Sequence, residues 1–436
     1  MRVIGIRHRT KQTAQQEARP TMVAVYDGIK AVTHELSTET DELDFLLDRF
    51  PTAFREVKPE EDVSDALSWH CKCKPLKKGQ EVPADIHPSH IREKDGGREI
   101  IMKVPSAFEG FRKGDAVAMT LGGSGDRFAA ALSRRGEDIG AYVYRIPPFV
   151  LKANRGDESK EEDQRLLAEL FDLRPELFYE MTAKDRELVR VREFLFKREE
   201  AQDARIACEQ RLRQSIIGGI FLSEEGCYPE GTIEKQFDHL KASSAIFLAL
   251  NKEEAQWEAN LKKLIRRTEV WQKIFKAIEG CGEVTAAKLI AAIGGDVRRF
   301  KSAAQLKRFC GVHIMDDGKF PRKRAGEIAG WNPQARQALY LLAEQFSMWR
   351  PQSHWGKVFL GYKAKLRLAH PNVECSTCNI PWDDCTQQKQ HKRRYGDGHI
   401  HSMAKWRTLT KFVEWLYREW SRIEPAAIVM DGVAAD

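Results

Sequence analysis

Three cysteines and a histidine near the C-terminus have the spacing of a metal site. The segment ECSTCNIPWDDCTQQKQH forms a Cys-x2-Cys-x6-Cys-x5-His array from Cys375, Cys378, Cys385 and His391. Thiolates two residues apart reach one tetrahedral Zn²⁺, and a later cysteine and imidazole complete a closed structural site. His399 and His401 are alternative fourth ligands, and a cluster without metal is the alternative to the whole site. We predict structural zinc.

Carboxylates are the second group of candidates. Two-metal nuclease chemistry needs about four of them around paired Mg²⁺, because both the attacking and the leaving oxygen must be held. Asp27 ends the first strand that we predict, and Asp163 lies on the helix after the predicted sheet. Asp126 follows a GGSG turn, whereas most acids in EEDQ suit a solvated helix start. We predict Asp27 and Asp163 as the catalytic candidates.

A glycine turn and a basic run mark the centre of the chain. In AIEGCGEVTAAKLIAAIGGDVRRF, Gly280 and Gly282 form a turn at a helix start, where backbone N–H groups favour a phosphate. The basic residues that follow are Arg298, Arg299, Lys301, Lys307, Arg308, Lys319, Arg322, Lys323 and Arg324. Acids are sparse among them, so we predict nucleic-acid contacts rather than a merely solvated face.

The elements that must position these residues change character along the chain. Four short apolar runs, TMVAVYDG, REIIMKV, DAVAMTL and AYVYRI, with a helix in FAAALSRRG, predict a partly parallel α/β sheet. Residues 50–100 are irregular and are interpreted as an insertion or lid. Two charged helical blocks follow, separated by EEGCYPEGT, and predict an antiparallel hairpin. The last helix, KWRTLTKFVEWLYREW, carries aromatic residues that we assign to the core.

Length and charge agree with several domains. The chain has 436 residues, which is too long for one hydrophobic core. Its net charge of +7 makes it mildly basic. We predict an α/β domain over 1–155, a helical hairpin or coiled coil over 156–275, a nucleic-acid-binding unit over 276–350, and C-terminal helices with the Cys/His site over 351–436. No run suits a bilayer or a signal peptide, which predicts a cytoplasmic protein without membrane contact.

Several stretches together resemble a known group of proteins. The domain order, the turn IEGCGEVTAAKLIAAIGGDVRRFKSAAQLKRFCGV and the HIHSMAKW…FVEWLYREW ending are similar to bridge-RNA-guided insertion-sequence transposases with an N-terminal DEDD, RuvC-like domain. The central unit also resembles the Nop domain of box C/D ribonucleoproteins. Proteins that combine these features form the Tas group of TIGR systems. The resemblance implies an RNase H-type, RuvC-like α/β domain, a helical hairpin, and a mostly helical Nop- or transposase-like domain with a small zinc-binding insertion.

The resemblance also implies roles for particular positions. Asp27 matches the first DEDD acid and Asp163 the last, but the glutamate falls at Thr120 and the third acid at Lys160. Asp157 or Glu162 are substitutes for the third acid, and Asp126 for the second. The transposase serine would lie near MDDGKF, which has no serine, so that mechanism lacks its nucleophile.

Three functions follow. The first is an RNA-guided DNA-binding protein with a degenerate nuclease centre, which holds a small guide RNA and a double-stranded DNA target. The alternatives are a Mg²⁺-dependent RuvC-type endonuclease and a DEDD-type transposase. We favour the binding protein over the enzymes. The amphipathic hairpin further predicts a homodimer.

Overall fold

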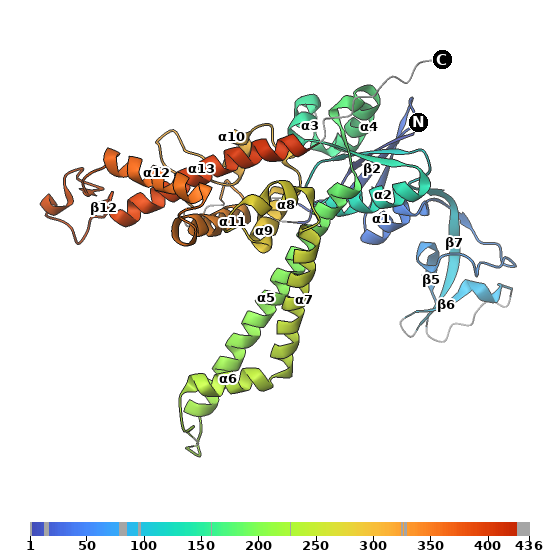
Figure 1. The fold of residues 1–436 in the computed structure, drawn as a ribbon. Coiled ribbons are helices and arrows are strands. Elements are labelled where there is room, and N and C mark those ends of the chain that lie inside the picture. The colour runs from blue at the N-terminus through green and yellow to red at the C-terminus, as the bar shows by residue number, and fades with distance from the viewer. Residues whose placement is uncertain are drawn as a thin grey trace.

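The chain folds into a mixed α/β part followed by a mostly helical part, as the sequence predicted (Figure 1). The computed structural model describes residues 2–12, 17–77, 85–94, 97–157, 159–226, 228–323, 326 and 329–424. Arg324, one of the predicted nucleic-acid contacts, lies outside this part of the chain.

The main sheet has six strands in the order β10-β9-β8-β1-β2-β3. These are β1 (Val3–Arg7), β2 (Thr21–Tyr26), β3 (Ala31–Leu36), β8 (Ala116–Thr120), β9 (Tyr142–Ile146) and β10 (Tyr179–Glu180). β8 is parallel to both β1 and β9, whereas β2 is antiparallel to β1 and to β3. Sequence analysis missed β1. Its side chains are buried on both faces of the sheet, so the segment shows no alternation of apolar and polar residues.

Helices cover both faces of this sheet. On one face, α1 (Glu39–Leu46) and α2 (Asp126–Ile139) contribute to a core that contains Ile4 and Ile6 of β1. On the other, α3 (Pro148–Arg155) and α4 (Asp163–Leu173) pack on Val3 and its neighbours. The backbones of β1 and α4 approach so closely that a Cβ on Gly5 would lie 1.8 Å from the Gln164 carbonyl oxygen. The sheet unit therefore extends beyond residue 155, the end that we predicted for it.

Residues 50–100 are more ordered than their composition suggested. β4 (Phe50–Glu56), β5 (Lys72–Pro75), β6 (Ile91–Lys94) and β7 (Gly97–Glu109) form a second, antiparallel sheet. This small sheet projects from the main one (Figure 1), and its fully buried apolar side chains among the described residues are Val63, Ile101 and Val104. The segment REIIMKV lies in β7 and thus belongs to the insertion, not to the main sheet.

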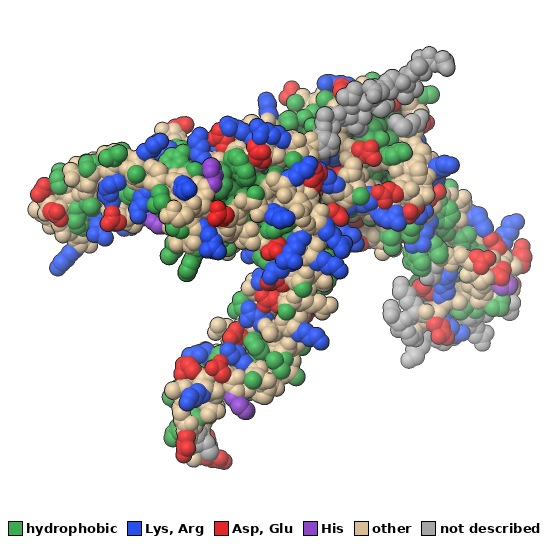
Figure 2. Space-filling model, viewed as in Figure 1, with side chains coloured by type: hydrophobic (Ala, Val, Ile, Leu, Met, Phe, Trp, Pro, Cys, Tyr) green, Lys and Arg blue, Asp and Glu red, His purple; other side chains and the backbone are tan. Residues whose placement is uncertain are grey.

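A long helical hairpin projects from the junction of the two halves of the molecule (Figure 1). α5 (Ala183–Phe221) has 39 residues and is therefore about 58 Å long. α6 (Ile233–Ser243) lies at the tip, and α7 (Ala245–Ile265) returns along α5 (Figure 1). Arg198 and Arg205 of α5 both form ion pairs with Glu254 of α7, at 2.9 and 2.6 Å. Basic and acidic side chains alternate along the hairpin, whereas basic ones gather near its root (Figure 2).

The remaining chain is mostly helical. It contains α8 (Glu269–Lys273), α9 (Glu283–Ile293), α10 (Ala303–Phe309), α11 (Pro333–Glu344), α12 (His354–Ala369) and α13 (Asp397–Ile423). Two short strands, β11 (Glu374–Cys375) and β12 (Arg393–Arg394), pair between α12 and α13. Leu339, Phe412 and Trp420 are buried in a core that also takes in the root of the hairpin. Among the described helices, none is long and apolar enough to cross a membrane.

Candidate functional site

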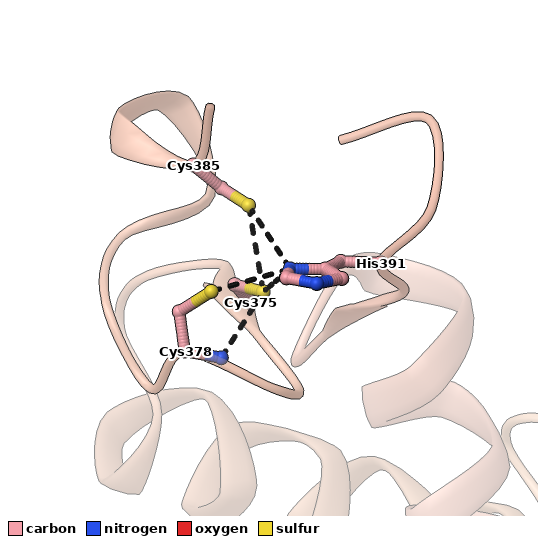
Figure 3. Close-up of side chains that lie close together, drawn as sticks. All are labelled: Cys375, Cys378, Cys385 and His391. Carbon is pink, nitrogen blue, oxygen red and sulfur yellow. Dashed lines mark hydrogen bonds between the residues drawn. The ribbon is translucent and has the colours of Figure 1, made fainter. Parts of the chain in front are cut away.

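The Cys/His array forms one compact cluster in the structure (Figure 3). The candidate ligand atoms of Cys375, Cys378, Cys385 and His391 all lie within 4.8 Å of one another. Nδ1 of His391 is 3.5, 3.2 and 3.6 Å from the three sulfur atoms, in sequence order. Tetrahedral Zn²⁺ with ordinary bond lengths separates such ligand atoms by about 3.6–3.8 Å. The cluster therefore has the size and donor set of a four-coordinate metal site.

Local structure positions the ligands and favours the thiolate. β11 carries Cys375 and pairs with β12 just after His391, and the Arg394–Glu374 ion pair at 2.7 Å joins the strands. Although burial opposes it, hydrogen bonds from the backbone N–H groups of Cys378 and Thr377 lower the pKa of Cys375 to about 6. A low pKa suits a metal ligand, since the thiolate is the form that binds metal.

The two other histidines are engaged elsewhere. Nδ1 of His399 accepts a hydrogen bond from the backbone N–H of Tyr395 at 2.9 Å, and its ring stacks on Tyr395. His401 packs edge-on against Phe359 of α12. The structure thus selects His391 as the fourth candidate ligand, a choice that spacing alone left open.

The predicted catalytic acids do not converge. Asp27 is exposed in the turn after β2, where backbone N–H groups of Lys30 and Ile29 donate to its carboxylate and lower its pKa. β2 runs antiparallel to β1, so this turn lies beside Val3, whereas Asp163 lies near Arg7 at the other end of β1. Four residues of strand separate these ends by about 13 Å. The expectation that both acids share one metal centre is wrong, because we took β2 for the first strand.

The end of β1 near Asp163 has a different set of side chains. Arg7 ends β1, and the pairing of Ile6 with Met119 places Thr120 beside it. The carboxylate of Asp163 is held on both oxygens by Arg155, with Nε–Oδ1 at 2.6 Å and Nη2–Oδ2 at 2.7 Å. Burial, and then repulsion by Arg19, lower the pKa of Arg7. We refer to Arg7, Thr120, Arg155 and Asp163 below as the sheet-edge group.

The substitute acids do not complete a metal site either. Lys160 and Glu162 are exposed just before α4, as is Asp157. Asp126 is buried and is bound to Arg192 at 3.0 Å. Among the described residues, the Cys/His cluster alone brings three or more candidate metal ligands together. The charge that two metal ions require is therefore not assembled at the sheet edge.

The glycine turn is tight but already carries a negative charge. Gly280 has a φ of +86°. Gly282 precedes α9, and a Cβ atom added to Gly282 would point into open space. Glu283, the first residue of α9, pairs with Arg266 at 2.6 Å. Since an acid at this position already interacts with the helix N-terminus, it competes with a phosphate there.

Two of the predicted nucleic-acid contacts are partly buried where the two halves of the molecule meet. Arg298 binds Asp296 and lies 3.1 Å from Asp185 of α5, and although burial opposes it, the Asp296 hydrogen bond raises its pKa. Arg299 donates to the Ile293 carbonyl oxygen at 2.8 Å, and burial lowers its pKa. Because both arginines pair or pack inside the protein, they offer less to nucleic acid than the sequence indicated, and their contact with nucleic acid stays a prediction.

Most of the other basic side chains remain accessible. Lys307 is half-buried near Glu414, at 3.7 Å, and the exposed ones are Lys301, Arg308, Lys319, Arg322 and Lys323. Lys307 and Arg308 line a cavity of about 510 Å³ together with His313 and Thr410. Burial, then Arg308 and Arg336, lower the pKa of His313. A basic surface is therefore present, but it is smaller than the sequence indicated.

Sequence analysis missed an aromatic and basic cavity next to this surface. Trp331, Arg336 and Tyr340 belong to the segment around α11, and Trp406 belongs to α13. We had assigned the α13 aromatics to the core, which Phe412 and Trp420 confirm. Trp406 packs against the same core and also lines the cavity. Trp331, on the other side of Arg336, is so distant in sequence that spacing carries no signal of their proximity.

Comparison with known families connects this helical region to mobile DNA. Residues 272–357 match the family model of the IS116/IS110/IS902 family of transposases. The matched segment runs from α8 into α12 and includes the glycine turn and the basic surface. It supports a relation to insertion-sequence transposases and hence a role connected with DNA. No curated protein matches the chain.

Proposed function

We propose that this protein is a nucleic-acid-binding protein that holds a small guide RNA and is directed to double-stranded DNA by RNA–DNA base pairing. The observation that carries the proposal is the contrast between the transposase-like segment and the sheet-edge group. The transposase-like segment has accessible cations and cavities, whereas the sheet-edge group pairs its one central acid with arginine. The guide RNA comes from the resemblance to the Tas group, in which pairing supplies specificity.

The sheet supports descent from a nuclease. In the order β3-β2-β1-β8-β9, β2 alone runs against its neighbours, with α4 packed on β1. This arrangement agrees with the RNase H-type, RuvC-like fold that the resemblance implies. The agreement concerns the fold, and function has to be argued from the side chains.

Those side chains disfavour cleavage. Arg7 brings a positive charge to the end of the central strand, and Arg155 neutralises Asp163. Two Mg²⁺ ions would be repelled by Arg7 and would have to displace Arg155 from both carboxylate oxygens. The unit then serves as a structural platform for the helical half.

A nuclease is the second candidate, since the strand order favours it. A transposase is the third, supported by the family match. Asp317, in the segment where the nucleophilic serine was sought, accepts a hydrogen bond from the Lys319 backbone and pairs with the Lys319 side chain at 3.4 Å. A carboxylate in a turn of this kind does not replace a serine nucleophile.

We propose structural roles for the metal cluster and for the hairpin. With three thiolates and one imidazole, the cluster suits zinc and leaves no open coordination position for catalysis. At the hairpin tip, Phe221, Leu222 and Ile246 are 70, 81 and 70% exposed. Apolar side chains gathered at one end of a helical hairpin favour pairing with a second copy of the chain.

The test is to purify the full-length protein from cells that carry its own flanking DNA and to sequence the RNA that accompanies it. One discrete small RNA is the expected result. Duplex DNA complementary to that RNA should then be bound but not cut across a Mg²⁺ and Mn²⁺ series. Cleavage that Asp163→Asn abolishes would establish the nuclease instead. Degraded bulk RNA, or none, would leave only a transposase-related DNA-binding protein.

A further inference from the structure

An arginine lies between two tryptophans at the surface of the helical half. The guanidinium carbon of Arg336 is 4.5 Å from the ring centroid of Trp331 and 4.6 Å from that of Trp406. Its Nη1 is buried and has no hydrogen-bond partner in the described part of the chain, and no described Asp or Glu pairs with it. Partial burial of a cation without a counter-charge raises the free energy of the folded state, so binding of an anion at this site would be favourable.

The arginine opens onto a cavity with aromatic walls. The cavity has a volume of about 390 Å³ and is lined by Trp331, Arg336, Tyr340 and Trp406, with Lys323 at its border. Tyr340 is 42% exposed, and Lys323 is exposed. A second cavity, of about 630 Å³, shares Lys323 and Trp331. The combined site thus offers two cations and several aromatic rings to one ligand.

We propose that this cavity binds one unpaired nucleotide of a single-stranded nucleic acid, with its phosphate on Arg336 and Lys323 and its base against Tyr340 and Trp406. The proposal rests on the proposed nucleic-acid function and assigns a subsite to it. A free inorganic anion would satisfy the arginine but would leave the aromatic surfaces in water. A continuous duplex offers phosphates but keeps its base faces stacked, whereas an unpaired base stacks readily on aromatic side chains.

The surroundings allow a strand to continue beyond this nucleotide. The cavity of about 510 Å³ is lined by Arg308 and His313. Burial, then the charge of Arg308, and then the charge of Arg336 lower the pKa of His313, so this cavity lies close to Arg336. Nδ1 of His313 is also buried without a hydrogen-bond partner among the described residues. A strand that leaves the aromatic cavity therefore meets a second cavity, whose lining includes Arg308 and His313.

The test measures binding of full-length protein to three fluorescent probes by anisotropy: a 10-nucleotide single-stranded RNA, the DNA of the same sequence, and the corresponding DNA duplex. Tyr340→Ala and Arg336→Gln should each weaken single-strand binding by about tenfold, the size of one base–aromatic contact, and should change duplex binding less. Tyr340→Phe keeps the ring and should retain affinity. Arg418→Gln, on the exposed side of α13, removes the same charge elsewhere and is the control.

The outcomes separate this proposal from the broader one. If the wild-type protein binds nucleic acid and Tyr340→Ala binds the single strands equally well, the subsite is refuted and the proposed function remains. If the variants lose duplex and single-strand binding alike, Arg336 acts only as general charge, which also refutes the subsite. If the wild-type protein binds none of the probes, both proposals fail. Because Tyr340 is accessible, its variants provide an answer even if Arg336→Gln does not fold. Comparison of the RNA and DNA probes shows which strand supplies the nucleotide.

Discussion

The sheet edge and the aromatic cavity are two regions of one chain that treat charge in opposite ways. At the sheet edge, Asp163 is bound on both oxygens by Arg155. In the aromatic cavity, Arg336 lies between two rings and leaves Nη1 unsatisfied among the described residues. A charged group that is already paired inside the protein has few hydrogen-bonding positions left for a ligand. From this difference we infer that the helical half binds nucleic acid and that the sheet unit has a structural role.

The largest effect is expected at the metal cluster, which must hold the end of the helical half in shape. Cys385→Ser should reduce bound zinc from about one equivalent to near none, since structural sites need all four ligands. Residues between α12 and α13 should then become sensitive to limited proteolysis. Metal analysis of purified protein provides the measurement. Cys208→Ser, on α5 and outside the cluster, should keep its metal. Equal zinc in both variants would contradict the assignment.

The next largest effect concerns the junction between the two halves. Arg145 of β9 is buried and lies 3.0 Å from Asp185 of α5 and 3.9 Å from Asp296 of the helical half. Arg145→Met should lower the free energy of unfolding by up to about 3 kcal/mol, because it leaves Arg298, among the described residues, as the one remaining arginine that pairs with both buried carboxylates. Denaturant unfolding measures this. Arg134→Met on α2, where the arginine is exposed and pairs with Asp138, is the control and should leave the denaturation midpoint nearly unchanged.

A smaller, pH-dependent effect is expected at the same junction. Burial, and then Asp296, raise the pKa of Glu424 to about 7 despite Arg298 and Lys184 nearby. The folded state keeps a proton that the unfolded state releases near pH 4.5, the ordinary pKa of a glutamate, so this contribution to stability is complete at low pH. It is lost as the pH rises to about 7, by at most about 3 kcal/mol. Thermal melting of Glu424→Gln should vary less over this window, and an unchanged pH profile would argue against the shift.

The smallest effect, and the one that sharpens the comparison most, concerns surface charge. Replacing Lys319, Arg322 and Lys323 by alanine should weaken duplex binding and reduce the slope of log K against log salt by up to about 2.7, or 0.9 for each phosphate contact. The control removes the same charge from the sheet unit through Arg127, Arg134 and Arg165, which are 66, 60 and 61% exposed. Salt titrations that show equal losses for both variants would remove the distinction between the halves.

The sequence predicted those features that depend on local spacing. The Cys/His array and the mixed α/β class could be recognised because their signals lie within a few residues or repeat along one element. The first strand was missed because it is buried on both faces, and Asp27 was misplaced as a result. Arg298 resembled a surface charge because the contact that ties it to the other half, with Asp185, is made across 113 residues of chain. The pairing of Trp331 with Trp406 around Arg336 is likewise a product of the tertiary fold alone.

The central claim is that nucleic acid contacts the helical half and not the sheet edge. Its most direct test is ultraviolet crosslinking of the natively purified complex, followed by mass spectrometry of the peptides that carry nucleotides. Our account predicts crosslinks within residues 301–340 and 400–410, with Tyr340 or Trp406 among them. Crosslinks confined to β1, β8 and the start of α4 would contradict it and would return the sheet edge to consideration as the working site.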